Sequence, residues 1–110
     1  MSHRIAQINE IIKYEVNNLL LTEIDWPKGC LVTITSVGTS KDLRYTKIWI
    51  SVIPDIFTQK VLDILKKNIG HLQFLLNKKL STKPLPRLNF AIDETEKKAA
   101  EIEKLLNEIT

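Results

Sequence analysis

The chain has 110 residues, of which 44% are hydrophobic and 26% are charged, and its formal net charge is +3. This composition is ordinary for a water-soluble globular protein and excludes the disordered and fibrous classes. We expect one domain, residues 1–110, which buries about two thirds of its unfolded surface and needs no disulfide or metal for stability. Because the sequence contains neither a membrane-spanning apolar run nor a signal-peptide pattern, we expect a cytoplasmic protein with no membrane partner.

The first predicted element is a helix. Between His3 and Leu21 the apolar residues recur at steps of three and four, which is the helical period. Ser2 can cap the start of this helix, and Pro27 ends the segment because proline disfavours helix at the residue before it. We expect Trp26 to pack against the core at the helix end.

Two strands are predicted next, at residues 30–37 and 43–53, and a short polar turn joins them. Residues in the second strand alternate between the two faces of the sheet, with Ile48, Ile50 and Val52 on one face and Lys47, Trp49 and Ser51 on the other. One face is therefore buried and the other wet, so we expect helices to cover only one side of the sheet. Trp49 then lies on the open face beside Lys47, where it shields a cross-strand neighbour or meets a ligand.

The stretch from Lys60 to Leu80 combines a basic edge with an apolar one. On a helical wheel Lys60, Lys67, His71 and Lys78 fall within about 20° of one line, and the leucines occupy roughly the opposite 100°. Asp55 is a suitable N-cap for this helix. Gly70 lies in the middle, where glycine disfavours helix by about 1 kcal/mol against alanine, so we expect a kink or a short break there.

Positive charge is concentrated in this part of the chain. Residues 60–87 contain seven lysines and arginines against one aspartate, a net charge of +6, whereas the whole chain carries +3. Polyanion binding needs neighbouring cations that release condensed counterions together, so this segregation predicts a nucleic-acid surface.

A third strand is predicted at residues 87–92, and a last helix begins near Asp93, with Glu96 three residues on as in a capping box. The apolar stripe of this helix is Ala99, Ile102, Leu106 and Ile109. The predicted order is α-β-β-α-kink-α-β-α, in an α+β fold with a three-stranded sheet. A right-handed helical crossover brings the third strand parallel to the second or antiparallel to the first.

The sequence shows none of the residue patterns that catalysis or metal binding needs. His3 and His71 are the only histidines, Cys30 is the only cysteine, and no phosphate-binding glycine loop is present. We expect Cys30 to be a buried structural thiol, in keeping with a reducing cytosol. No catalytic residue, metal site or cofactor is predicted, and the pattern favours a binding protein over an enzyme.

Several segments together resemble the bacterial ribosome-binding factor A family over nearly the whole chain. They are HRIAQINEIIKYEV at residues 3–16, LVTITSVGTSKDLRYTKIWISVI at residues 31–53, Gly70, the segment Pro86-x-Leu88-x-Phe90, and Asp93. The resemblance implies a type II KH-like fold in which a kink between helices, usually alanine-x-glycine, replaces the GxxG loop. Here Asn68 stands at the alanine position, and Gln73 stands where many members have arginine.

The resemblance also implies a non-catalytic assembly factor that binds the 30S ribosomal subunit and its 16S rRNA during late maturation and rRNA processing and that matters for growth in the cold. We expect it to act as a monomer. Combined with the basic helix, it identifies candidate RNA-binding residues, which are Lys60, Lys67, Gly70, His71, Lys78, Lys79, Lys83 and Arg87, with Arg44 and Lys47 from the hairpin.

Structured RNA is the expected ligand, because the sequence offers no row of exposed aromatic residues for base stacking. Phe74 lies near the basic line on the wheel and is the exception, so we expect it either to stack on a base or, as the favoured alternative, to pack in the core. Two alternatives stay open. One is a protein-interaction module that uses apolar helix faces, and the other is a small enzyme whose site the sequence does not reveal.

Overall fold

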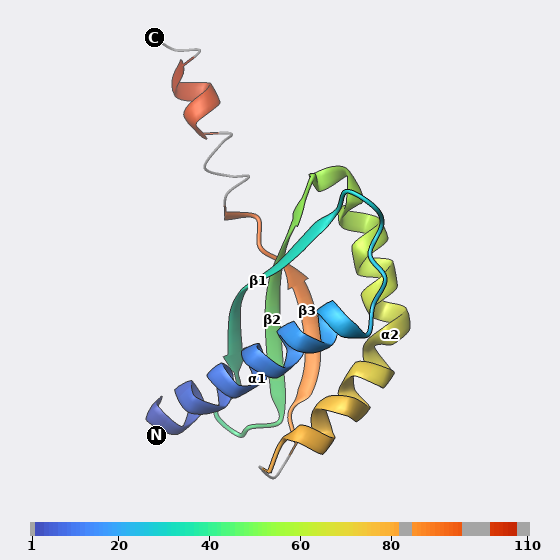
Figure 1. Ribbon diagram of the computed structural model, residues 1–110. Helices are drawn as coiled ribbons and strands as arrows, with labels where there is room; N and C mark the ends of the chain where they lie inside the picture. The colour runs from blue at the N-terminus through green and yellow to red at the C-terminus, as the bar shows by residue number, and fades with distance from the viewer. Residues whose placement is uncertain (1, 82–84, 96–101, 108–110) are drawn as a thin grey trace.

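A computed structural model describes residues 2–81, 85–95 and 102–107 of the chain (Figure 1). Its elements are α1 (Ser2–Thr22), β1 (Leu31–Thr39), β2 (Tyr45–Ile53), a short 3-10 helix η1 (Asp55–Phe57), α2 (Thr58–Lys79) and β3 (Arg87–Ile92). Residues 102–107 are also helical. No helix in these ranges combines the length and the apolar character needed to cross a membrane.

The three strands form one mixed sheet in the order β1-β2-β3. β1 and β2 are an antiparallel hairpin whose register shifts between Ile34 and Ser36, where a bulge interrupts the pairing. β3 lies parallel to β2, with Tyr45 opposite Arg87 and Ile50 opposite Ile92. Of the two placements predicted for the third strand, the parallel one is correct, and α2 supplies the crossover that a parallel pair requires.

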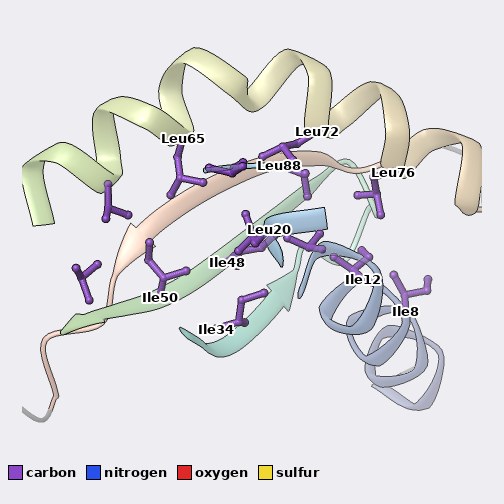
Figure 2. Close-up of a cluster of buried hydrophobic side chains, with 14 residues drawn as sticks. Ile8, Ile12, Leu20, Ile34, Ile48, Ile50, Leu65, Leu72, Leu76 and Leu88 are labelled. Atoms are coloured by element: carbon purple, nitrogen blue, oxygen red, sulfur yellow. The ribbon is translucent and has the colours of Figure 1, made fainter. Parts of the chain in front are cut away.

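Both long helices pack on the same face of the sheet (Figure 2). The buried residues form a single hydrophobic cluster to which α1, α2 and alternate positions of the strands contribute. The alternation predicted for β2 is confirmed, since Ile48, Ile50 and Val52 are buried. Among the described residues neither long helix covers the other face of the sheet, where Tyr45 and Lys47 are exposed, as the sequence predicted. The element order and the mixed sheet agree with the predicted α+β class.

α2 contains no break at Gly70. Helical structure is continuous from Thr58 to Lys79, although the helix axis changes direction partway along, in the yellow part of Figure 1. The side-chain amide of Asn68 donates to the carbonyl oxygen of Ile64 at 2.8 Å. Such bonding to the preceding turn bends helices, and Gly70 nearby lowers the resistance to bending. Of the two predicted possibilities, the kink is present and the break is not.

The predicted helix ends are only partly correct. Asp55 does not cap α2, because it lies in the intervening 3-10 turn and the cap position is taken by Phe57, without a side-chain hydrogen bond. Trp26 packs against the core as predicted, and its Nε1–H donates to the carbonyl oxygen of Leu20 at 3.0 Å. The side chain of Ser2 lies outside the described residues.

The start of the last helix is described only in part. Asp93 accepts a hydrogen bond from the backbone N–H of Thr95 at 2.9 Å, as a cap would, whereas Glu96 lies outside the described residues. Of the predicted apolar stripe, Ile102 and Leu106 are helical and exposed. Ala99 and Ile109 lie outside the described residues.

Candidate nucleic-acid interface

The solvent side of α2 carries most of the cations that the sequence predicted to bind RNA. Its buried residues are Val61, Leu65, Leu72 and Leu76, and they hold one side of the helix against the sheet. Lys60, Lys67, Lys78 and Lys79 are all exposed. Because the apolar side is fixed in the core, the ammonium groups face solvent, where a phosphate chain can reach them.

Carboxylates of the described residues form no ion pair with these lysines. In the described ranges, the only contact with ion-pair geometry joins His71 and Glu23, in which Nε2–H of the imidazole donates to Oε1 at 3.0 Å. This bond ties the middle of α2 to the chain just after α1. The lysine charges of α2 therefore stay available to a polyanion, while His71 has a protein partner and its role as an RNA donor stays a prediction.

Phe74 lies on the basic side of α2 and not in the core. Its side chain is 56% exposed, so the prediction that it packs in the core was wrong. The ammonium of Lys78 lies 4.3 Å from the centre of its ring, one helical turn away. The helix thus presents an aromatic ring among its lysines. A helical wheel places Phe74 only at the border between the basic side and the apolar side, so the wheel did not reveal this exposure.

Gln73 has a structural task that the sequence did not reveal. Its Nε2 donates to the carbonyl oxygen of Pro86 at 2.9 Å, and its Oε1 accepts from the backbone N–H of Leu88 at 2.9 Å. The amide therefore satisfies both outward-facing backbone groups at the start of β3, as a neighbouring strand would. The side chain at the position where the resemblance implies an arginine thus bonds to the backbone of the protein itself.

Gly70 is exposed, and a methyl group built on its Cα would meet no atom within 4 Å. No protein segment therefore needs the glycine for close approach. Among the described residues Gly70 therefore serves no close contact with another helix, and the space beside it is open to an RNA backbone.

The remaining candidate cations lie on the other side of the molecule. Arg87 and Lys47 occupy outward positions of β3 and β2, next to the buried residues Leu88 and Ile48 that face the helices. They point away from α2, so the structure divides the predicted site into a helix group and a sheet group. Lys83 lies outside the described residues.

The tight turn before β2 presents Arg44. The hydroxyl of Ser40 donates to Oδ1 of Asp42 at 2.6 Å, and the backbone N–H of Arg44 donates to the same oxygen at 3.1 Å. These two bonds hold the pKa of Asp42 below its ordinary value, with the Ser40 bond as the largest cause. The ionised carboxylate thus fixes the turn that places Arg44 beside β3.

Carboxylates gather at the opposite end of the sheet. Asp55, Asp93 and Glu94 line a cavity of about 390 Å³ where β2 and β3 end. Asp93 accepts hydrogen bonds from the hydroxyls of Thr95 (2.6 Å) and Thr35 (2.7 Å). Within the described ranges no group of three or more histidine, cysteine or acidic residues is arranged to hold a metal ion. The molecule is therefore acidic at this end of the sheet and basic along α2.

Cys30 is half-buried and packs against the core. Burial raises the pKa of its thiol above the ordinary value, which keeps it protonated at neutral pH. The structure thus agrees with a structural thiol.

Comparison with known proteins gives one consistent result. The family model described as ribosome-binding factor A matches residues 4–106. A relative from Desulforamulus reducens named ribosome-binding factor A is 36% identical over 99% of this chain and 92% of its own length. A second relative of that name, from Pseudomonas paraeruginosa, is 32% identical over 94% of this chain and 83% of its own length.

Solved structures share the fold. The crystal structure of ribosome-binding factor A from Thermus thermophilus matches with a TM-score of 0.71 at 20% identity, over 80% of this chain and 94% of the other. A homology model of the Thermus thermophilus factor, fitted into the cryo-EM map of its complex with the 30S subunit, matches with a TM-score of 0.58 at 19% identity, over 86% of this chain and 97% of the other. These likenesses confirm the KH-like fold. With the family match across almost the whole sequence, they show that the chain belongs to the ribosome-binding factor A family.

Proposed function

We propose that this protein is a non-catalytic assembly factor that binds the small ribosomal subunit through the basic side of α2. The observation that carries the proposal is the set of exposed lysines on α2 without carboxylate partners among the described residues. Clustered cations of this kind bind a phosphate chain by releasing its counterions. Family membership and the fitted complex of the Thermus thermophilus factor with the 30S subunit support the same assignment.

The finer proposal concerns the ligand and the timing. The protein binds 16S rRNA of an immature subunit during late maturation and rRNA processing, acts in the cytoplasm as a monomer, and matters most for growth in the cold. Lys60, Lys67, Lys78 and Lys79 contact phosphates, and Lys83 is a fifth phosphate contact of the same proposal. Gly70 leaves space at the bend where an RNA backbone can approach the helix.

Charge reversal on α2 tests the proposal directly. Lys67→Glu, Lys78→Glu and Lys79→Glu in one protein should abolish co-sedimentation with small subunits and leave the circular dichroism spectrum unchanged. The matched control replaces three exposed basic residues elsewhere, Arg4, Lys13 and Lys28, by glutamate and changes the net charge equally. If the first variant still binds, or if both variants lose binding alike, α2 is not the binding surface.

A protein-interaction module is the second candidate, because α1 also exposes apolar side chains. Ile11 is 48% exposed and Tyr14 is 67% exposed on its outer side. Ile11→Ser with Tyr14→Ser should leave subunit binding unchanged if the basic surface does the binding. Loss of binding in this double variant would favour the apolar surface instead.

A further inference from the structure

The open face of the sheet combines aromatic rings with cations. Tyr45, Lys47 and Trp49 occupy successive outward positions of β2, and Arg87 lies beside Tyr45 on β3. Tyr45 is 61% exposed, and Trp49 is half-buried. No carboxylate forms an ion pair with these cations in the part of the chain that the structure describes. In Figure 1 both long helices lie on the other side of the strands.

We propose that this face is a second RNA-binding surface, which holds an unpaired single-stranded segment by stacking bases on Tyr45 and Trp49. The inference rests on the proposed function, because the single-stranded segment belongs to the same RNA whose phosphates bind to the lysines of α2. Proteins recognise single-stranded RNA by stacking exposed bases on aromatic side chains beside a positively charged path for the backbone. The open face supplies both components.

The spacing along β2 suits two bases with a phosphate path between them. Tyr45 and Trp49 are four residues apart, which is about 13 Å along a strand, and Lys47 lies between them on the same face. The ammonium of Lys47 is 4.4 Å from the centre of the Trp49 ring. A base that stacks on Trp49 displaces this ammonium, which is then free to pair with the phosphate next to that base.

The end of the face near Tyr45 contains a cavity that suits one nucleotide. Arg44, Tyr45, Leu85 and Arg87 line a space of about 450 Å³, within the usual size range of small-ligand sites. The backbone N–H of Arg87 donates to the carbonyl oxygen of Arg44 at 2.8 Å, which fixes the two arginines as neighbours. Their two guanidinium groups can both donate hydrogen bonds to one phosphate, while the phenol ring of Tyr45 stacks on the base.

Gly38 keeps the surface beside β2 flat. It pairs with Lys47 across the hairpin, and a methyl group built on it would meet nothing within 4 Å. The strand backbone is therefore open to a planar base at this point. A larger side chain here would stand in the path of the RNA without meeting any part of the protein.

Charge on the face limits where RNA can lie. The basic residues are at the start of β2 and β3, whereas Asp55, Asp93 and Glu94 line the cavity at the far end. A phosphate chain is attracted to the first end and repelled from the second. The RNA segment is therefore short and confined to the half of the sheet that contains Tyr45, Lys47 and Arg87.

The expectation of structured RNA as the ligand rests on the absence of a row of exposed aromatic residues in the sequence, with Trp49 predicted either to shield a cross-strand neighbour or to meet a ligand and with no role assigned to Tyr45. The alternating order Tyr45-x-Lys47-x-Trp49 is the sequence signal that could have revealed the surface, because alternate strand residues share a face.

The test measures binding of the full chain to a short single-stranded oligoadenylate, with the oligoadenylate–oligouridylate duplex as control RNA. Tryptophan fluorescence should fall on addition of the single strand, because a stacked base quenches Trp49, whereas Trp26 is packed at the end of α1. The duplex should quench little. Trp49→Phe should lose the quenching but keep binding, measured as the anisotropy of labelled RNA.

Substitutions on the face should weaken binding of the single strand. Tyr45→Ala and Trp49→Ala should each weaken it by about 5- to 150-fold, the range found for loss of one stacking ring. Tyr45→Phe should bind almost as the wild type does, since the ring and not the hydroxyl supports the base. Gly38→Val should weaken binding by obstruction, and the triple lysine variant of α2 should keep its single-strand quenching.

Other outcomes would overturn the inference. The inference fails if Tyr45→Ala and Trp49→Ala bind the oligonucleotide as well as the wild type does. It also fails if the triple lysine variant of α2 is the only one of these variants that loses binding to the oligonucleotide. It also fails if sedimentation shows a dimer that these alanine variants dissociate, because a second copy then covers the face. A wild-type protein that binds small subunits but no oligoadenylate refutes this surface and leaves the proposed function intact, whereas failure to bind subunits refutes the proposed function.

Discussion

Gly70 occupies an ordinary helical position with free space around it. Gly70→Ala should raise the free energy of unfolding by about 1 kcal/mol, because alanine is the better helix former and no atom lies within 4 Å of the new methyl group. Urea denaturation measures the change. Gly29→Ala is the matched control and should lower stability, since Gly29 has a φ of +82° that strains a side chain.

The same Gly70→Ala protein separates two roles for the glycine. A stabilised variant that binds small subunits more weakly would mean that RNA approaches the helix at the bend. Unchanged binding would remove Gly70 from the site, and a fall in stability would contradict the open surroundings described for it.

Gln73 bonds to the backbone at the outer edge of β3. Its replacement should therefore lower the free energy of unfolding by more than is usual for a half-buried polar residue. Gln73→Leu leaves the N–H of Leu88 and the carbonyl oxygen of Pro86 without their partner, so the free energy of unfolding should fall by about 1–3 kcal/mol. Chemical denaturation checks this value. Gln59→Leu on the same helix is the control, because Gln59 bonds only to exposed Asp63 and should cost about 0.5 kcal/mol or less.

Asp93 makes the stability of the folded protein depend on pH in the acidic range. Hydrogen bonds from Thr95 and then Thr35 hold the pKa of Asp93 below its ordinary value of 3.8. Because the folded-state pKa is the lower one, this contribution is fully present above 3.8 and disappears as the pH falls through the folded value. Asp93→Asn should therefore be less stable than the wild type at neutral pH, with a difference that shrinks in acid.

Urea unfolding of both proteins at neutral pH and well below the ordinary pKa measures this effect. Thr95→Ala removes the largest cause of the shift and should show part of the same pH dependence. A difference between Asp93→Asn and the wild type that persists unchanged in strong acid would mean that the carboxylate charge is not responsible.

α2 shows how one helix separates stability from binding. Leu72 is fully buried, and Phe74, two residues on, is 56% exposed. Leu72→Ala should lower the free energy of unfolding by about 2–5 kcal/mol because it leaves a cavity in the core. Phe74→Ala should cost about 1 kcal/mol or less, since it loses an exposed contact with Lys78.

Thermal and urea denaturation of the two variants measure this contrast. Equal destabilisation would contradict the orientation of α2, because the exposed side would then contribute to the core as much as the buried side does.

Patterns with a regular period were the ones that sequence analysis predicted well. The alternation in β2 and the buried leucines of α2 follow from local geometry alone, so both predictions were correct. Asp55 failed as a cap because the 3-10 turn Asp55–Phe57 precedes α2, and a three-residue segment is too short to show a period that marks where a helix begins. Gln73 could not be interpreted either, because its partners lie 13 and 15 residues away and are set by the tertiary fold.

The whole molecule divides the predicted cations between two opposite surfaces. A helical wheel correctly ordered the lysines of α2, but it contained no information on Arg87, whose direction depends on which face of β3 meets the helices. Knowledge of sheet topology was needed to separate Arg44, Lys47 and Arg87 from the helix group. The exposure of the cations was thus predictable within one element and their division between two surfaces was not, while their role in RNA binding stays a prediction.

Salt should weaken subunit binding strongly if phosphate contacts dominate. On duplex-like sites the logarithm of the binding constant falls with the logarithm of salt by about 0.9 per phosphate neutralised. Each lysine of α2 replaced by glutamine should therefore make the slope less steep by about 0.9. Titrations at several salt concentrations measure this, with Lys13→Gln as the control, and a flat response in the wild type would favour an apolar interface.

Neither border of the three-stranded sheet offers an easy template for a further strand. The amide of Gln73 occupies the outward backbone groups at the start of β3, and the irregularity between Ile34 and Ser36 disrupts the outer strand β1. A sheet edge that is exposed and regular, unlike these two, can pair with further chains and seed fibrils when the protein is concentrated. With both sheet edges protected in this way, the chain can stay dispersed at the high protein concentration of a crowded cell.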